Sequence, residues 1–182
     1  MNTIIHPMEI TTAEYLYNNC ILQATLAQVE QASVWYFEAQ EVAEDVAEIL
    51  GTSLEVGASI VSAFSPRERW ASNVAKAYAF ANGKPVTGLS NNLKMANAAL
   101  EQGFDALKGQ KTNAFARAIA GDTNAVVIDV WMCRAANAPT DSPSKGLYNT
   151  LSDAVTSVAN EHGLSPRTAQ ALIWIVKRGS AE

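Results

Sequence analysis

Two residues near the middle of the chain have types and surroundings that could support covalent chemistry. Lys111 opens the amphipathic segment KTNAFARAIA just after the turn at Gly109, and Asp129 follows the apolar run AVVI eighteen residues later. A lysine amine acts as a nucleophile or base only when it is unprotonated, and a helix N-terminus with partial burial favours that neutral form. An aspartate before VWMCRAAN is a good N-cap, so its carboxylate would be a negative charge of fixed orientation. The same residues also fit a solvated lysine and a purely structural cap.

Composition excludes several other kinds of site. The chain has 182 residues, 48% of them hydrophobic, which is enough for one core or for two lobes that share a seam. The two cysteines, Cys20 and Cys133, and the two histidines, His6 and His162, lack partners at the spacing of metal ligands. We therefore expect no metal and no cofactor.

The termini and hydropathy predict a protein of the cytoplasm. No stretch approaches 18 consecutive apolar residues, and MNTIIHPMEI lacks the basic start and apolar centre of a signal peptide. We therefore expect no membrane partner.

Charge is distributed very unevenly along the chain. The net charge is −5, yet residues 1–66 contain nine of the 18 acidic residues and neither Lys nor Arg. All 13 basic residues lie after position 66 with the other nine acids, which gives that part a charge of +4 (13 − 9). An acidic helical region can simply maintain solubility, whereas a basic half can also meet a polyanion such as DNA.

Helix signals predominate from one end to the other. Apolar residues recur every three or four positions, and glycines 51, 83, 103, 121 and 163 are placed to end helices. Thr11 or Thr12 is a candidate cap for the first helix, and Ser65-Pro66 and Ser165-Pro166 both have the cap-plus-proline pattern of a helix start. The only strand-like run, AVVI, is too isolated to make a sheet. We predict an all-α fold with eight or nine helices, an acidic helical region at 1–52 and a second helical region at 53–182, with both regions in one unit.

The segment LKGQKTNAFARAIAGDTNAVVIDVWMCRAA resembles the centre of the helix-hairpin-helix DNA glycosylase superfamily, to which endonuclease III and 8-oxoguanine DNA glycosylase belong. The resemblance rests on Leu107, Gly109, Lys111-Thr112, Ile128-Asp129-Val130 and Arg134. Weaker likeness extends over about residues 59–178. The hairpin of this family normally has two glycines separated by one residue, whereas LKGQKT is shorter and keeps only Gly109.

This resemblance implies a helix-hairpin-helix element and a reaction on a nucleotide flipped out of duplex DNA. Lys111 would attack the sugar C1′ and form a Schiff base, and Asp129 would stabilise positive charge on the sugar and orient or deprotonate the nucleophile. The residues expected to contact DNA are Lys108, Gly109, Gln110, Thr112 and Arg134. The residues expected to line the base pocket are Trp70, Asn73 and Trp131.

The sequence leaves three functions open. The first is a DNA glycosylase with lyase activity, which acts on duplex DNA or modified phage DNA. Small divergent relatives in bacteriophages also include enzymes that remodel modified thymines, so a base-modifying transferase on the same scaffold is the second. The third is a non-catalytic module that binds DNA or protein. A homodimer formed through the N-terminal helices is a further expectation.

Overall fold

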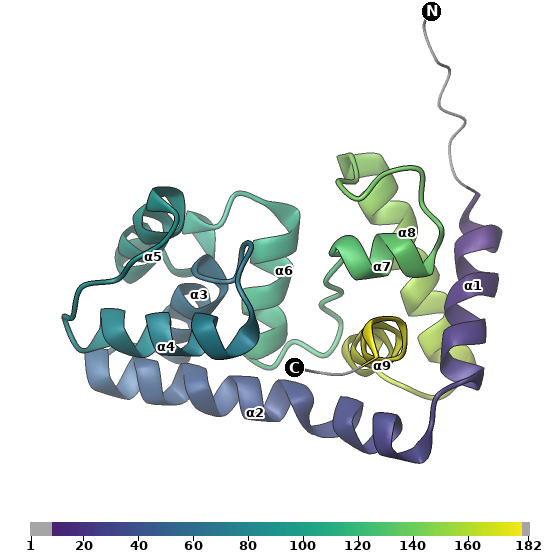
Figure 1. Ribbon diagram of the computed structural model, residues 1–182, viewed down its shortest axis with the longest axis horizontal. Helices are drawn as coiled ribbons and strands as arrows, with labels where there is room; N and C mark the ends of the chain where they lie inside the picture. Colours follow the sequence, from purple (N-terminus) through teal and green to yellow (C-terminus); the bar gives the residue numbers. More distant parts are fainter. Residues whose placement is uncertain (1–8, 180–182) are drawn as a thin grey trace, which may run out of the picture. The chain divides into compact units, whose positions relative to one another are not determined.

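The computed structural model describes residues 9–179, and within them every regular element is a helix (Figure 1). This confirms the predicted all-α class and its number of helices. The run Ala125–Ile128 is buried but forms no strand. Nine α-helices and one 3-10 helix follow in the order α1 (Ile10–Leu22), α2 (Leu26–Leu50), α3 (Leu54–Ala63), α4 (Trp70–Ala81), α5 (Ser90–Gln102), η1 (Gly103–Ala106), α6 (Gln110–Ile119), α7 (Val130–Ala135), α8 (Lys145–Glu161) and α9 (Pro166–Arg178).

Serine side chains begin three of these helices. Ser53, Ser144 and Ser165 each accept a hydrogen bond from a backbone N–H in the first turn of α3, α8 and α9. Such bonds satisfy donors that a helix start otherwise leaves without partners. The expectation for α1 was wrong, because this helix begins at Ile10 after Glu9 and has no side-chain cap.

The Ser65-Pro66 pair does not begin a helix, contrary to the sequence prediction. The Ser65 N–H donates to the Ser62 carbonyl, so this serine completes the end of α3. The chain then turns through Arg67, whose φ of 63° is left-handed, and α4 starts only at Trp70 after Arg69. The prediction was wrong because Ser65 belongs to the turn that ends α3.

Contacts between residues divide the chain into two units. One unit combines the chain up to Val34 with the segment from Val126 onwards, and the other is Trp35–Ala125. The two helical regions expected from the sequence, with their boundary between residues 52 and 53, stay a prediction.

The first unit is built from α1, α7, α8 and α9. Helix α1 packs on α8 and α9, and α7 packs on α9 (Figure 1). Because the four helices come from both ends of the unit's sequence, its core joins residues more than 100 positions apart. The fully buried large side chains in this core include Tyr17, Ile128, Met132, Leu151, Val155 and Ile173.

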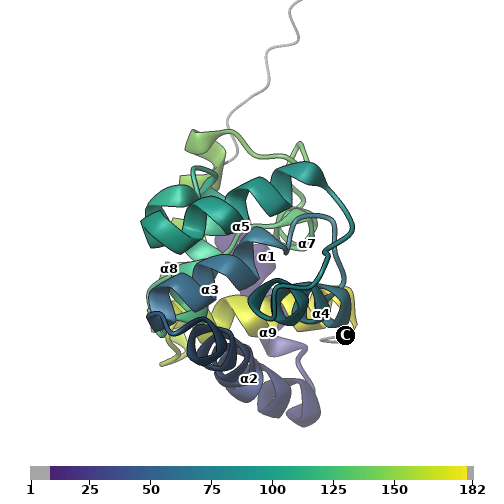
Figure 2. The ribbon, with the colours of Figure 1, turned by 90° about the vertical axis from the view of Figure 1, so that its left-hand side faces the viewer.

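Helix α3 is the centre of the second unit. It contacts α4, α5, α6 and η1, and seven consecutive residues from Gly57 to Ala63 are buried. In Figure 2, α5 lies on one side of α3 and α2 on the other. Gly57 permits the close approach of α2, because a Cβ at this position would overlap the backbone carbonyl oxygen of Ala43.

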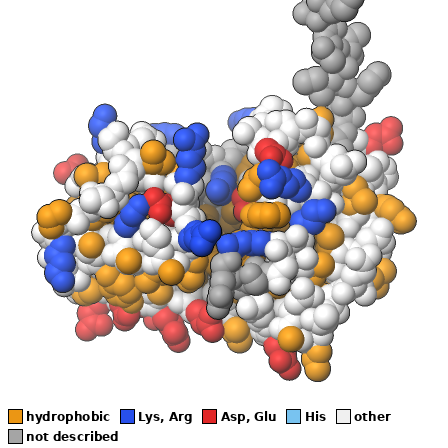
Figure 3. Space-filling view, in the orientation of Figure 1, with side chains coloured by type: hydrophobic (Ala, Val, Ile, Leu, Met, Phe, Trp, Pro, Cys, Tyr) orange, Lys and Arg blue, Asp and Glu red, His pale blue; other side chains and the backbone are white. Residues whose placement is uncertain are grey.

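Acidic side chains follow the exposed side of α2. Figure 3 shows them along the edge that this helix forms, and all six acidic residues of α2 are exposed, with no Lys or Arg in the helix. Large apolar side chains are exposed on α1 and α2 as well, among them Tyr15, Leu22, Leu26 and Phe37. The homodimer expected through these helices stays a prediction.

Within residues 9–179 no single helix has the length and apolar character needed to cross a membrane. Helices α2 and α3 together meet that test by length and composition, with a bend of 111° between them.

Candidate functional site

The turn between η1 and α6 is held by side chains of α6. The Asn113 side-chain amide donates to the carbonyls of Phe104 at 3.0 Å and Leu107 at 3.2 Å, and its oxygen accepts from Arg117 Nε at 2.8 Å. The Arg117 guanidinium also lies over the Phe104 ring, 4.6 Å from its centre. These bonds connect α6 to η1 and to the first residue of the turn, so Asn113 helps to fix the turn geometry. Sequence reasoning did not identify this residue.

The residues expected to contact DNA at this turn differ in accessibility. Lys108 and Gly109 are exposed, and Gln110 is half-buried. Thr112 is only 8% exposed, its hydroxyl donates to the Gly109 carbonyl, and its own carbonyl accepts from Ser62. Thr112 therefore has a structural role in the turn. Gly109 has an ordinary extended backbone, with φ −77°, so no positive φ requires glycine there.

Lys111 occupies the second position of α6, as the sequence predicts. It is half-buried, and the described residues offer its ammonium neither an ion-pair nor a hydrogen-bond partner. A lysine without a carboxylate partner at a positive helix end is electrostatically unfavourable by a few tenths of a kcal/mol up to about 1 kcal/mol. Among the described residues its amine thus takes part in no hydrogen bond or ion pair.

An aromatic cluster lies one helical turn beyond Lys111. Phe115, four residues on along α6, contacts Trp35 and Trp70 with ring centres 6.0 and 6.4 Å apart, and Trp35 and Trp70 are 5.4 Å apart. Trp35 also meets Tyr36 edge to face at 4.7 Å. Trp70, an expected pocket residue, is therefore packed among other rings and is partly buried.

Asn73 lies one turn after Trp70 on α4 and is 2% exposed. Its Oδ1 atom is buried without a hydrogen-bond partner in the part of the chain that the structure describes. Most buried polar atoms in proteins form at least one hydrogen bond, and the Asn73 oxygen is an exception to this rule.

Asp129 is the N-cap of α7, as the sequence predicts. Its Oδ1 accepts from the backbone N–H groups of Trp131 at 2.9 Å and Met132 at 3.0 Å. Helix α7 is only six residues long, so its formation depends strongly on such terminal bonds and on packing. The charge of Asp129 also lies at the favourable, positive end of the helix.

The second oxygen of Asp129 has a partner that the sequence did not indicate. The indole Nε1–H of Trp174, on α9, donates to Oδ2 at 2.9 Å. The two residues are 45 positions apart, and their contact depends on the packing of α7 against α9. Three hydrogen bonds therefore fix the carboxylate in position and in rotation.

Two buried tyrosines hold the backbone on either side of Asp129. The Tyr148 hydroxyl donates to the Val126 carbonyl at 2.9 Å and accepts from the Ile128 N–H at 3.2 Å. The Tyr17 hydroxyl donates to the Met132 carbonyl at 3.0 Å. Burial raises the pKa of Tyr148 to about 12 and raises that of Tyr17 further, so both phenols stay protonated and serve as donors at neutral pH.

Arg134, an expected DNA contact, is engaged with its neighbours. Its guanidinium forms a two-point interaction with the Asp141 carboxylate, with a shortest N–O distance of 2.7 Å, and lies over the Trp131 ring at 5.3 Å. Both charged side chains are about half exposed. A phosphate would therefore have to compete with Asp141 for Arg134.

The expected site residues thus fall into two groups. Lys108, Gly109, Gln110, Lys111, Thr112, Trp70 and Asn73 belong to the second unit, whereas Asp129, Trp131 and Arg134 belong to the first. The structure brings together Asp129 with Trp174, and Trp131 with Arg134, within the first unit. Convergence of Lys111 and Asp129 on one substrate is part of the proposal below.

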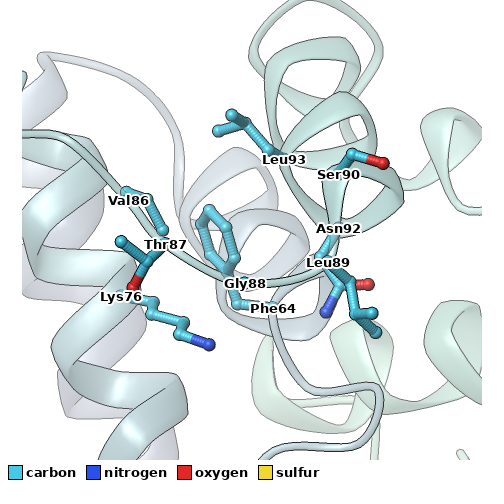
Figure 4. Close-up of a pocket in the computed structure, with 9 residues that line it drawn as sticks. All are labelled: Phe64, Lys76, Val86, Thr87, Gly88, Leu89, Ser90, Asn92 and Leu93. Carbon is cyan, nitrogen blue, oxygen red and sulfur yellow. The ribbon is translucent and has the colours of Figure 1, made fainter.

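A small cavity opens between α4 and α5 in the second unit. Figure 4 shows the Phe64 ring in the middle of its lining, with Lys76, Gly88 and Asn92 around it. Its volume of about 30 Å³ is enough for a single water molecule. A cavity of this size has no room for a nucleobase, and Lys76 in its lining is paired with Glu68. Among residues 9–179 there is no group of three or more His, Cys, Asp or Glu side chains that could hold a metal ion.

The chain belongs to the family described as "Family of unknown function (DUF7178)", which it matches over residues 8–181. No curated protein and no solved structure matches it.

Proposed function

We propose that this protein is a DNA glycosylase with lyase activity that removes a damaged or modified base from DNA. The Lys111 amine attacks C1′ of a flipped nucleotide, the glycosidic bond breaks, and the base leaves with the bonding electrons and takes up a proton. The resulting carbon–nitrogen link becomes a Schiff base when the sugar ring opens. Asp129 stabilises the positive charge that develops on the sugar.

The observation that carries this proposal is the arrangement of the Asp129 carboxylate. Preorganised charge accelerates a reaction because no rearrangement is needed when charge develops in the transition state. Asp129 is held by two backbone N–H groups and one indole N–H, so its carboxylate has a fixed orientation. The substrate must therefore bind with its developing positive charge close to this carboxylate. This favours electrostatic stabilisation over a role as a mobile base.

Lys111 complements that fixed charge. It lies in the first turn of α6 without a structural partner among the described residues. DNA is the proposed partner, and the exposed Lys108 at the preceding turn is the proposed first contact with a phosphate. The cytoplasmic location of the protein stays a prediction, and this would be the host cytoplasm if the chain is phage-encoded.

Borohydride trapping on a panel of duplexes with damaged or modified bases tests the proposal. Reduction of the Schiff base would give a covalent protein–DNA adduct with the wild type and none with Lys111→Ala. Lys145→Ala is the matched control, because Lys145 is an exposed lysine in the first turn of α8. We expect Asp129→Asn to slow base release by about a hundredfold.

Other results would favour the remaining functions. Loss of a modified base without an abasic site, seen by mass analysis of the nucleosides, would indicate a transferase. If Lys111→Ala and Asp129→Asn leave every measured activity and DNA affinity unchanged, a non-catalytic module is the better description.

A further inference from the structure

We propose that Trp174 is a positioning residue, whose indole N–H holds the Asp129 carboxylate in the orientation needed for catalysis. This inference rests on the proposed function and deepens it. The residue lies on α9, outside the segment that suggested the catalytic pair.

The hydrogen bonds of Asp129 show why a second holding group is needed. Oδ1 already accepts two backbone N–H bonds from the cap, which uses both of its acceptor sites. Those two bonds hold only one of the two carboxylate oxygens. The Trp174 bond to Oδ2, at 2.9 Å, holds the other, so the orientation of the carboxylate is restrained at both oxygens.

The same bond decides where the carboxylate can act. Oδ2 has two acceptor sites, and Trp174 uses one of them. The remaining site lies beside the indole, so any cation or developing positive charge that Asp129 meets must approach there. Trp174 thereby sets the direction of approach without touching the reacting atoms itself.

The indole is itself held in place. Trp174 packs against the core of the first unit, and Ile173 and Ile175 beside it on α9 are fully buried. The Arg178 guanidinium lies over its ring, 4.8 Å from the centre.

Single-turnover base release under saturating protein tests the role. Trp174→Phe keeps an aromatic ring but removes the donor, and we expect the rate constant to fall about tenfold while DNA affinity is unchanged. In Trp174→His the five-membered ring can place Nε2 where the indole has Nε1, so this variant should recover part of the rate. The matched control is Tyr15→Phe, which removes a hydrogen-bond donor from an exposed aromatic side chain on α1 and should react at the wild-type rate.

A spectroscopic measurement tests the bond without any reaction. In a ¹H–¹⁵N spectrum, Trp174→Phe assigns the indole signal of Trp174, and that signal should move in Asp129→Asn but not in Asp153→Asn. Asp153 is an exposed carboxylate on α8 and serves as the control. If the chemical shift of the Trp174 indole signal did not change in Asp129→Asn, the inference would be overturned.

The two proposals fail in different ways. A wild-type protein that forms no adduct and releases no base from any duplex overturns the proposed function, and the positioning role falls with it. An active wild type with an equally fast, folded Trp174→Phe variant overturns only the positioning role. A slow Trp174→Phe with normal DNA affinity and partial recovery in Trp174→His supports both.

Discussion

Replacement of Asp129 by alanine should destabilise the protein measurably, whatever its activity. The change removes the acceptor for two backbone N–H groups at the start of α7, and loss of an N-cap costs about 1 kcal/mol. It also leaves the Trp174 indole N–H without its acceptor. An unpaired donor costs about 1–3 kcal/mol, and the lower end applies because Trp174 is only partly buried. The sum is about 2 kcal/mol, which corresponds to a fall in Tm of about 4–8 °C for a chain of this size.

Equilibrium urea unfolding followed by circular dichroism, together with calorimetry, would measure this effect. Asp129→Ser separates its two parts, because serine is as good an N-cap as aspartate but is too short to reach Trp174. We expect this variant to recover about half of the loss. Asp153→Ala is the control and should change the free energy of unfolding by less than about 0.5 kcal/mol.

The reasoning would be refuted if Asp129→Ala were as stable as Asp153→Ala. That result would mean that water replaces all three hydrogen bonds without cost. A loss in Asp129→Ser equal to that in Asp129→Ala would place the whole effect in the Trp174 bond and none in the cap.

Two further predictions concern packing and charge. Gly57→Ala should lower the free energy of unfolding by about 2 kcal/mol, because its Cβ would overlap the Ala43 carbonyl and a packed helix pair cannot easily separate. Gly146→Ala, where a Cβ meets no atom within 4 Å, should be neutral or slightly stabilising in the same urea titration, and equal behaviour of the two variants would contradict the packing argument. Asp141→Asn should release Arg134 and tighten DNA binding several-fold, with a steeper dependence on salt concentration. Unchanged affinity in fluorescence anisotropy would show that Arg134 does not contact DNA.

Local sequence signals were sufficient for some helix starts. Ser165 and Asp129 cap helices as predicted, because a cap needs only its own side chain and the next two or three backbone N–H groups. The same signal was wrong at Ser65, where the end of α3 already uses the residue.

The candidate site was predictable only in part. The sequence identified Lys111 and Asp129, since a lysine in the first turn of a helix and a capping aspartate are local features. It did not reveal that Asn113 holds the turn before Lys111, although an asparagine in a first turn is a residue type that can bond backbone carbonyls.

Sequence alone therefore determined the helical class, some of the helix starts and the position of both candidate catalytic side chains along the chain. Tertiary structure decided which groups surround those side chains. Trp174 reaches Asp129 across 45 residues because α7 packs on α9, and Tyr17 reaches Met132 across 115 residues because α1 joins the same core. Hydrogen bonds between distant helices depend on packing, and no local pattern of residue types encodes their partners.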